Sequence, residues 1–323
     1  MEKEFLTYNQ QMRHLRDDKK IACTGSAHKT MLCRYGYFNL INGYKAPFIS
    51  GQDSNGNHTY YPGTTIEHLT HVKKFDDDLR SLLLKYITQV EEEVRTFASY
   101  KFDEVNKKGK LYWYQVDAFD SSCDTTNIVK FISEAFAEIN RSKLEYVRYY
   151  MEHHKSIPTW ILTKVIGFSI FINFVNCSKR NVRDSLCQLY SIIDSRGFNN
   201  YKLLIGSLHW LRIVRNTCAH NERVYTITDK NSRIIENYFK TFPASYSRSN
   251  DKRIIDLLIY LKYYLASEDY SNLIKQFQEM LTTLESKIPT NAFNYVRAQM
   301  GIKDISHLQL LLQNTKKIDY NKF

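Results

Sequence analysis

The chain has 323 residues, of which 43% are hydrophobic, and this composition argues against intrinsic disorder and allows a sizeable core. Glycine (11 residues) and proline (5 residues) are scarce, which argues against a loop-rich β protein and favours helices. The formal net charge is +11, which favours a polyanionic partner, most simply nucleic acid; a basic protein without such a partner is the alternative.

The first 70 residues are the least regular part of the chain. The stretch "FLTYNQQMRHLRDD" is compatible with a short helix, whereas residues 50–65 ("SGQDSNGNHTYYPGTT") have the glycine, asparagine and serine content of a loop. Between them, "YGYFNLINGY" is rich in aromatic residues. These rings either pack against the helices or stack on nucleic-acid bases, and packing is the interpretation that we favour.

A long amphipathic helix is predicted next, over residues 75–102. Thr65 gives a helix-capping signal, and the acidic run 76–78 lies at the start of the helical pattern. Glu91 and Arg95 lie one turn apart and can pair. The apolar residues recur every three or four positions and therefore share one face: Leu79, Leu82, Leu83, Tyr86, Ile87, Val90, Val94 and Phe97.

The middle of the chain continues the helical pattern. Residues 125–154 are helical by periodicity, and residues 158–179 ("PTWILTKVIGFSIFINFVNCSK") are apolar nearly all round, which predicts a central buried helix. The segment 111–119 ("LYWYQVDAF") is the best candidate for a short strand. Residues 201–220 predict a helix with one apolar face, made of Leu204, Leu208, Leu211, Val214 and Cys218.

The C-terminal part predicts three more helices, over residues 251–267, 270–287 and 289–302. The fold class is therefore mainly α. We divide the chain into an N-terminal helical and irregular region (1–70), a helical core (71–230) and a C-terminal helical extension (231–323).

The cysteines and the apolar stretches bear on localisation. The six cysteines form no C-x-x-C pair, and several fall within apolar patterns, so we expect reduced, buried thiols. The longest apolar stretch, 160–175, is interrupted by Lys164 and is short for a bilayer span. Since the N-terminal residues lack the apolar region of a signal peptide, we expect a cytoplasmic protein without a membrane partner.

The polar stretch "RNTCAH" (215–220) ends the helix predicted before it. At about 100° per residue, Asn216, His220 and Arg223 share one face, and the long side chain of Arg215 can reach round to it. Histidine transfers protons near neutral pH, arginine grips phosphate oxygens, and asparagine orients the imidazole or binds phosphate. These residue types suit RNA cleavage without a metal or a cofactor; a capped core helix is the alternative.

The same arginine–histidine spacing occurs at Arg148 and His153, so the spacing alone is a weak signal. Tyr149 follows that arginine in aromatic surroundings, and packing is therefore the role predicted for this second copy. His68 and His71 could share a helix face as metal ligands. No third ligand is evident near them, so we predict surface residues and no metal site.

Positive charge concentrates around the motif. Residues 141–225 contain 13 Lys and Arg against 5 Asp and Glu, so +8 of the total of +11 lies there. A basic loop at 107–110 is either solvated or in contact with an RNA backbone. The residues that we predict to bind RNA are Arg212, Arg223, Lys107, Lys108, Lys110, Lys179, Arg180 and Arg183.

The stretch "IVRNTCAHNERVY" (213–225) resembles the signature of the Abi-like (AbiD/AbiF) abortive-infection proteins, which carry a HEPN-type R-N-x-x-x-H motif followed by an arginine. Three more blocks agree with that family in the same order. They are "FLTYNQQMRHL" with "YGYFNLINGYKAPF", then "FDDDLRSLLLKYITQVEEEVR", then "PTWILTKVIGFSIF", and together with the motif they extend from about residue 5 to residue 225.

The resemblance implies a HEPN-like helical bundle, here with extra N- and C-terminal helices, and an RNA-directed role in phage defence. It implies that Arg215 and His220 are catalytic, that Asn216 is the polar residue after the arginine, and that two copies form a homodimer with one metal-independent site. Many relatives have a second histidine where this chain has Asn221. Some relatives are restrained by a structured small RNA, as in a toxin–antitoxin system, and the basic segment suits such a partner.

Three functions are compatible with these observations. The first is an endoribonuclease toxin that acts in phage defence. The second is an RNA-binding protein that uses the same basic surface without cutting. The third is a structural or interaction protein in which the motif lies at a dimer seam, and failure to co-purify with RNA would favour it.

Overall fold

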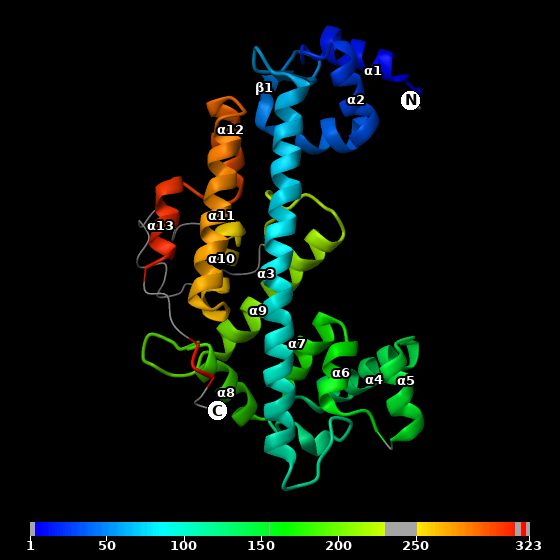
Figure 1. The fold of residues 1–323 in the computed structure, drawn as a ribbon, viewed down its shortest axis with the longest axis vertical. Helices are drawn as coiled ribbons and strands as arrows, with labels where there is room; N and C mark the ends of the chain where they lie inside the picture. Colours follow the sequence, from blue (N-terminus) through cyan, green and yellow to red (C-terminus); the bar gives the residue numbers. More distant parts are fainter. Residues whose placement is uncertain (1–3, 155, 230–250, 314–317, 321–323) are drawn as a thin grey trace.

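The computed structural model describes residues 4–154, 156–229, 251–313 and 318–320. Within these residues the regular structure is helical apart from one two-stranded sheet, so the predicted mainly α class is confirmed. Helix α3 (Ile66–Asn106) has 41 residues and runs along most of the long axis of the molecule (Figure 1). The segments before and after it pack along its length.

Helix α3 is longer than the helix predicted over residues 75–102, because it begins directly after the capping residue. The Thr65 side chain accepts a hydrogen bond from His68 N at 3.2 Å, and Thr65 N donates to His68 Nδ1 at 3.3 Å. The added first turns bury Leu69 and Val72 in the core. His68 therefore caps the helix. His68 and His71 are both half-buried, so the prediction that they are surface residues is wrong.

The N-terminal segment packs against the beginning of α3 (Figure 1). The loop predicted at residues 50–65 contains a short antiparallel hairpin, in which Ile49 pairs with Tyr60. The elements before α3 are α1 (Tyr8–Arg13), the π-helical turn η1 (His14–Asp18), α2 (Gly25–Tyr35), a second π-helical turn η2 (Phe38–Asn42), the 3-10 turn η3 (Ala46–Phe48), β1 (Ile49–Gln52) and β2 (His58–Tyr60).

The strand predicted at residues 111–119 does not form. This segment is a series of turns that ends in the 3-10 turn η4 (Val116–Ala118). Trp113 is buried, and its Nε1 donates to the Ile157 carbonyl at 2.7 Å. The aromatic residues that suggested a strand therefore anchor a turn against the chain before α6.

The single buried helix predicted over residues 158–179 is divided in two. Ile166 and Gly167 adopt extended backbone conformations between α6 (Thr159–Val165) and α7 (Phe168–Cys177). Arg95 of α3 stabilises the break, because its Nη1 donates to the Ile166 carbonyl at 2.9 Å and so satisfies an acceptor at the end of α6. The neighbouring helices are α4 (Thr125–Arg141), α5 (Glu145–His153), α8 (Arg180–Leu189) and α9 (Tyr201–Ala219).

The C-terminal helices agree with the three that the sequence predicts. Helix α10 is buried on all sides, α11 packs against α3, and Tyr264 of α10 shares a 2.6 Å hydrogen bond with Ser207 of α9. The three predicted helices are α10 (Ile254–Tyr264), α11 (Ser267–Glu285) and α12 (Thr290–Gln299). The 3-10 turn η7 (Ile305–His307) and the short helix α13 (Leu308–Leu311) follow them and were not predicted. Residues 231–250 of the predicted extension lie outside the described residues, and the domain division stays a prediction.

Four of the six cysteines are buried as expected, but Cys33 is exposed and Cys123 is half-buried. All six are free thiols. Cys123 Sγ lies 2.8 Å from Cys177 Sγ, and burial together with this neighbour raises the pKa of Cys177 to about 12. None of the described helices joins sufficient length with sufficient apolar character to cross a bilayer.

Candidate functional site

Helix α9 carries the motif at its C-terminal end. The predicted apolar face is confirmed, because Leu204, Leu208, Leu211, Val214 and Cys218 are all buried. The helix packs against α3. This packing fixes the last turn of α9 beside the middle of the longest helix, so the polar residues of the motif have a rigid support.

Arg215 is held by an acidic residue of α3. Its Nε lies 3.3 Å from Glu91 Oε2, and its Nη1 donates to Asn216 Oδ1 at 3.1 Å. The other oxygen of Glu91 accepts from Arg95 Nη2 at 2.6 Å, which confirms the predicted Glu91–Arg95 pair. The Arg215 side chain is still 35% exposed. The guanidinium is therefore oriented from one side and open to solvent on another.

Glu91 consequently lies between two cations, of which Arg95 is buried and Arg215 is not. Burial lowers the pKa of the Arg95 guanidinium, and the Glu91 carboxylate opposes that shift. The sequence predicted only the Arg95 contact. The contact with Arg215 joins residues 124 positions apart in the chain, which no local pattern indicates.

His220 lies just beyond the last residue of α9 and is exposed. Its backbone N donates to the Asn216 carbonyl at 2.9 Å, so the residue caps the helix. Among the described residues, none hydrogen-bonds to its ring. An exposed imidazole whose backbone is held in the helix cap can accept or donate a proton at a bound substrate.

The turn after His220 is a Schellman motif. Asn221 N donates to the Cys218 carbonyl at 3.1 Å and Glu222 N donates to the Thr217 carbonyl at 3.0 Å, while Asn221 has a φ of 58°. Asparagine is one of the few residues that tolerate this left-handed conformation. The left-handed turn thus gives a physical reason for Asn221 at this position.

We expect Asn221→Ala to lower the free energy of unfolding by about 1 kcal/mol, because alanine tolerates a positive φ less well. Asn221→Gly relieves the same conformation and is expected to be at least as stable as the wild type. Thermal denaturation of the three proteins measures the difference. If both variants lose stability equally, the asparagine side chain and not the backbone conformation is what matters.

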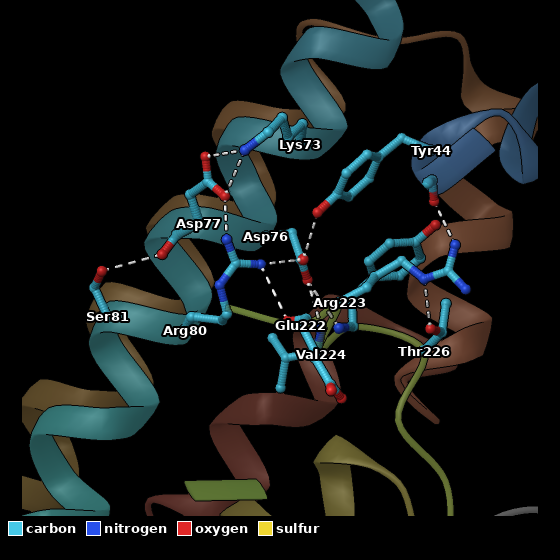
Figure 2. A network of polar contacts seen from close by, with 12 residues as sticks. Tyr44, Lys73, Asp76, Asp77, Arg80, Ser81, Glu222, Arg223, Val224 and Thr226 are labelled. Carbon is cyan, nitrogen blue, oxygen red and sulfur yellow. Dashed lines mark hydrogen bonds and ion pairs between the residues drawn. The ribbon is translucent and has the colours of Figure 1, made fainter. Parts of the chain in front are cut away.

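The chain after the motif is attached to α3 by Asp76 (Figure 2). Asp76 Oδ1 accepts from the backbone N of Val224 at 3.1 Å and of Tyr225 at 2.9 Å. Its Oδ2 accepts from the Tyr44 hydroxyl at 2.9 Å and from Arg80 Nη1 at 2.6 Å. Burial raises the pKa of the Asp76 carboxyl, and the four donors act against that rise by stabilising the carboxylate.

The sequence predicts that Arg223 lies on the helix face of the motif, but in the structure it does not. The prediction is wrong because α9 ends at Ala219 and the chain turns at Asn221. Arg223 Nε instead donates to Thr226 Oγ1 at 2.9 Å, and its Nη1 donates to the Gly43 carbonyl (Figure 2). The residue joins this loop to the N-terminal segment, although its side chain remains exposed.

The predicted basic residues fall into two places. Arg212 lies on α9 and is half-buried. Lys107, Lys108 and Lys110 are exposed in the loop that follows α3. This loop begins at Asn106, which lies about 15 residues beyond Glu91, or roughly 22 Å along the helix axis. The loop is therefore not part of the site around Arg215.

The remaining basic residues lie near the same end of α3. Lys179 Nζ donates to Asn106 Oδ1 at 2.8 Å, which brings it beside the 107–110 loop. Arg180 is exposed and lies 3.6 Å from Asp184. Arg183 is half-buried, pairs with Asp120 and covers the Tyr201 ring, so its charge is already balanced within the protein.

The second arginine–histidine copy is exposed on α5, and the packing predicted for it is limited to contacts at the surface. Arg148 Nη2 donates to the Lys143 carbonyl at 3.1 Å, and the His153 ring stacks on Tyr149 at 4.5 Å. The two side chains thus have partners within their own short segment. Among the described residues, no group of three or more His, Cys, Asp or Glu side chains is arranged to hold a metal ion.

Comparison with known proteins identifies a family. The family model of the Abi-like proteins matches residues 30–226, which is more than half of the chain. The matched segment contains α3, the Asp76 contacts and the motif at the end of α9. No curated protein and no solved structure matches the chain. The chain belongs to the Abi-like protein family.

Proposed function

We propose that the protein is a metal-independent endoribonuclease that acts in abortive infection, the form of phage defence that membership of the Abi-like family implies. The observation that carries the proposal is the last turn of α9. There Arg215 is oriented by Glu91 and Asn216, while the His220 ring is exposed and without a partner among the described residues.

Each residue has a role that fits its contacts. Arg215 binds a non-bridging phosphate oxygen and stabilises the extra negative charge of the transition state. His220 transfers a proton. Glu91 and Asn216 are positioning residues, because they contact the guanidinium of Arg215 and not the substrate.

The reaction needs two proton transfers. The 2′-oxygen attacks phosphorus and gives up its proton to a base, the bond from phosphorus to the 5′-oxygen breaks, and an acid protonates that oxygen. The products are a 2′,3′-cyclic phosphate and a 5′-hydroxyl. One copy supplies a single motif histidine, His220, so we propose a homodimer in which two copies of the motif supply both the base and the acid.

The basic surface is the second element of the proposal. Lys107, Lys108, Lys110 and Arg180 are exposed, and they lie about 22 Å from the motif along α3. A target RNA or a structured small RNA that restrains the protein would bind them through its phosphates. Arg183 is a weaker candidate for this contact because Asp120 neutralises it.

Growth inhibition tests the proposal in cells. Induction of the wild type in a bacterial host is expected to stop growth. Arg215→Ala removes the group that binds phosphate and His220→Ala removes the group that transfers a proton, so both variants are expected to be non-toxic. The matched controls are Arg148→Ala and His153→Ala, which alter the same spacing on α5 and should stay toxic. Undiminished toxicity of both motif variants, at equal protein levels, would contradict the proposal.

A second candidate is an RNA-binding protein that does not cut. The 3.3 Å ion pair between Arg215 and Glu91 favours it, because a neutralised arginine stabilises a transition state less well. This candidate predicts tight, salt-dependent RNA binding and intact RNA after prolonged incubation. RNA fragments from the wild type that are absent with His220→Ala would exclude it.

A further inference from the structure

A cavity of about 900 Å³ lies at the C-terminal end of α3, away from the motif. Its walls come from the last turns of α3, from the turn at residues 110–113 and from the beginning of α6. Asp103, one of its lining residues, lies about 12 residues beyond Glu91, or roughly 18 Å along the axis of α3. Tyr100, also in the lining, is roughly half a turn around the helix from Glu91.

Three exposed aromatic rings line this cavity, one from each wall. Tyr100 is 57% exposed, Tyr112 is 51% exposed and Trp160 is 52% exposed. Tyr112 is held in place by a parallel stack on Tyr114, with the ring centroids 5.5 Å apart. Buried Trp113 fixes the turn between them. Lys101 Nζ lies 5.4 Å from the Tyr100 ring centroid and Tyr114 stacks on one face of Tyr112, so a base would stack on the opposite face of each tyrosine. Exposed aromatic rings on a rigid support suit the stacking of nucleobases.

The polar groups of the cavity suit a nucleotide. Lys107 and Lys110 are exposed in its lining. Glu104 also lines it, but Lys101 Nζ lies 2.8 Å from its carboxylate and balances its charge. Asp103 Oδ1 accepts from Thr159 Oγ1 at 2.6 Å. No residue that the structure describes donates to its other oxygen, which can accept from a base N–H.

We propose that this cavity binds a nucleotide: the base stacks on Tyr100, Tyr112 and Trp160, and the phosphate pairs with Lys107 and Lys110. The nucleotide is either a free nucleotide or a unit of single-stranded RNA. Only in the second case does the inference rest on the proposed function, where the cavity holds unpaired RNA away from the scissile phosphate.

Tryptophan fluorescence gives a direct readout. Trp113 and Trp210 are buried, so a base that stacks in the cavity quenches chiefly the emission of Trp160. The probes are adenosine 5′-monophosphate and a short single-stranded RNA of mixed sequence, each titrated into the His220→Ala protein to prevent cutting. We expect saturable quenching, and we expect Trp160→Phe to abolish the quenching while it keeps most of the affinity.

Two substitutions separate stacking from charge. Tyr112→Ala is expected to weaken binding about tenfold through the lost stacking. For the RNA probe, the Lys107→Gln/Lys110→Gln variant is expected to reduce the slope of log K against log salt concentration by about 0.7 for each lysine. Phe198→Ala removes an exposed ring outside the cavity and is the control that should bind normally.

Quenching by the RNA alone identifies an RNA unit as the ligand, and quenching by the mononucleotide as well identifies the nucleotide itself. Either result supports the proposal if the Tyr112→Ala substitution weakens the binding. Absence of quenching by both probes, or unchanged binding by Tyr112→Ala, overturns it. Cleavage of RNA by the wild type is measured in parallel, so that failure of the cavity proposal is distinguished from failure of the proposed nuclease function.

Discussion

His220→Ala is expected to slow RNA cleavage by the purified protein by about 10²- to 10⁴-fold, the usual contribution of a positioned acid or base. Imidazole is the side chain used most often for general acid–base catalysis, and the His220 ring is exposed at the end of α9. Single-turnover cleavage of a labelled RNA measures the effect. Stability should change little, because the ring has no partner among the described residues.

The matched control for this variant is His153→Ala, whose ring stacks on Tyr149 on the exposed surface of α5. It is expected to cleave at the wild-type rate. Arg215→Lys provides a second comparison, because lysine keeps the charge but loses the fork that contacts Glu91 and Asn216. Equal rates for the wild type and His220→Ala would contradict the role of His220.

Asp76→Asn is expected to lower the free energy of unfolding by about 3 kcal/mol, in the range found when one partner of a buried ion pair is removed. The side chain of Asp76 is fully buried and accepts four hydrogen bonds, one of them from Arg80. An amide cannot accept all four and brings an N–H group toward donors. Urea denaturation measures the loss.

The acidic run itself offers the control. Asp78 is exposed, two positions from Asp76 on the same helix, and Asp78→Asn is expected to leave stability unchanged. Because Asp76 also fixes the backbone of Val224 and Tyr225, its variant should release the chain after the motif as well as destabilise the fold. Hydrogen exchange at those amides reports the release. Equal stability of the two variants would show that the carboxylate is dispensable.

Periodicity predicted the helices well because their apolar faces are local features of the sequence. The buried face of α9 and the three C-terminal helices follow directly from residues spaced three and four apart. The break between α6 and α7 could not be predicted in this way, because both halves are apolar. The carbonyl freed at Ile166 is satisfied by Arg95, which is distant in the sequence.

The sequence predicts residues of the candidate site but not the contacts from α3 that hold them. The sequence predicts Arg215 and His220 from the motif and its resemblance to a family signature, whereas the contacts to Glu91 and Asp76 come from α3 and are not local. One signal did exist for Asp76: it lies four residues after Val72 and three before Leu79, so it falls on the apolar face. The predicted position of Arg223 on the helix face fails because Asn221, with its positive φ, turns the chain just after α9 ends.

The most direct test of the account is the chemistry of the RNA ends that the purified wild-type protein produces in the presence of a chelator. The proposed mechanism predicts fragments with 2′,3′-cyclic phosphate and 5′-hydroxyl ends, and none of these fragments with His220→Ala. Intact RNA with the wild type, or the same ends and yields from His220→Ala, would contradict the claim that the end of α9 cuts RNA.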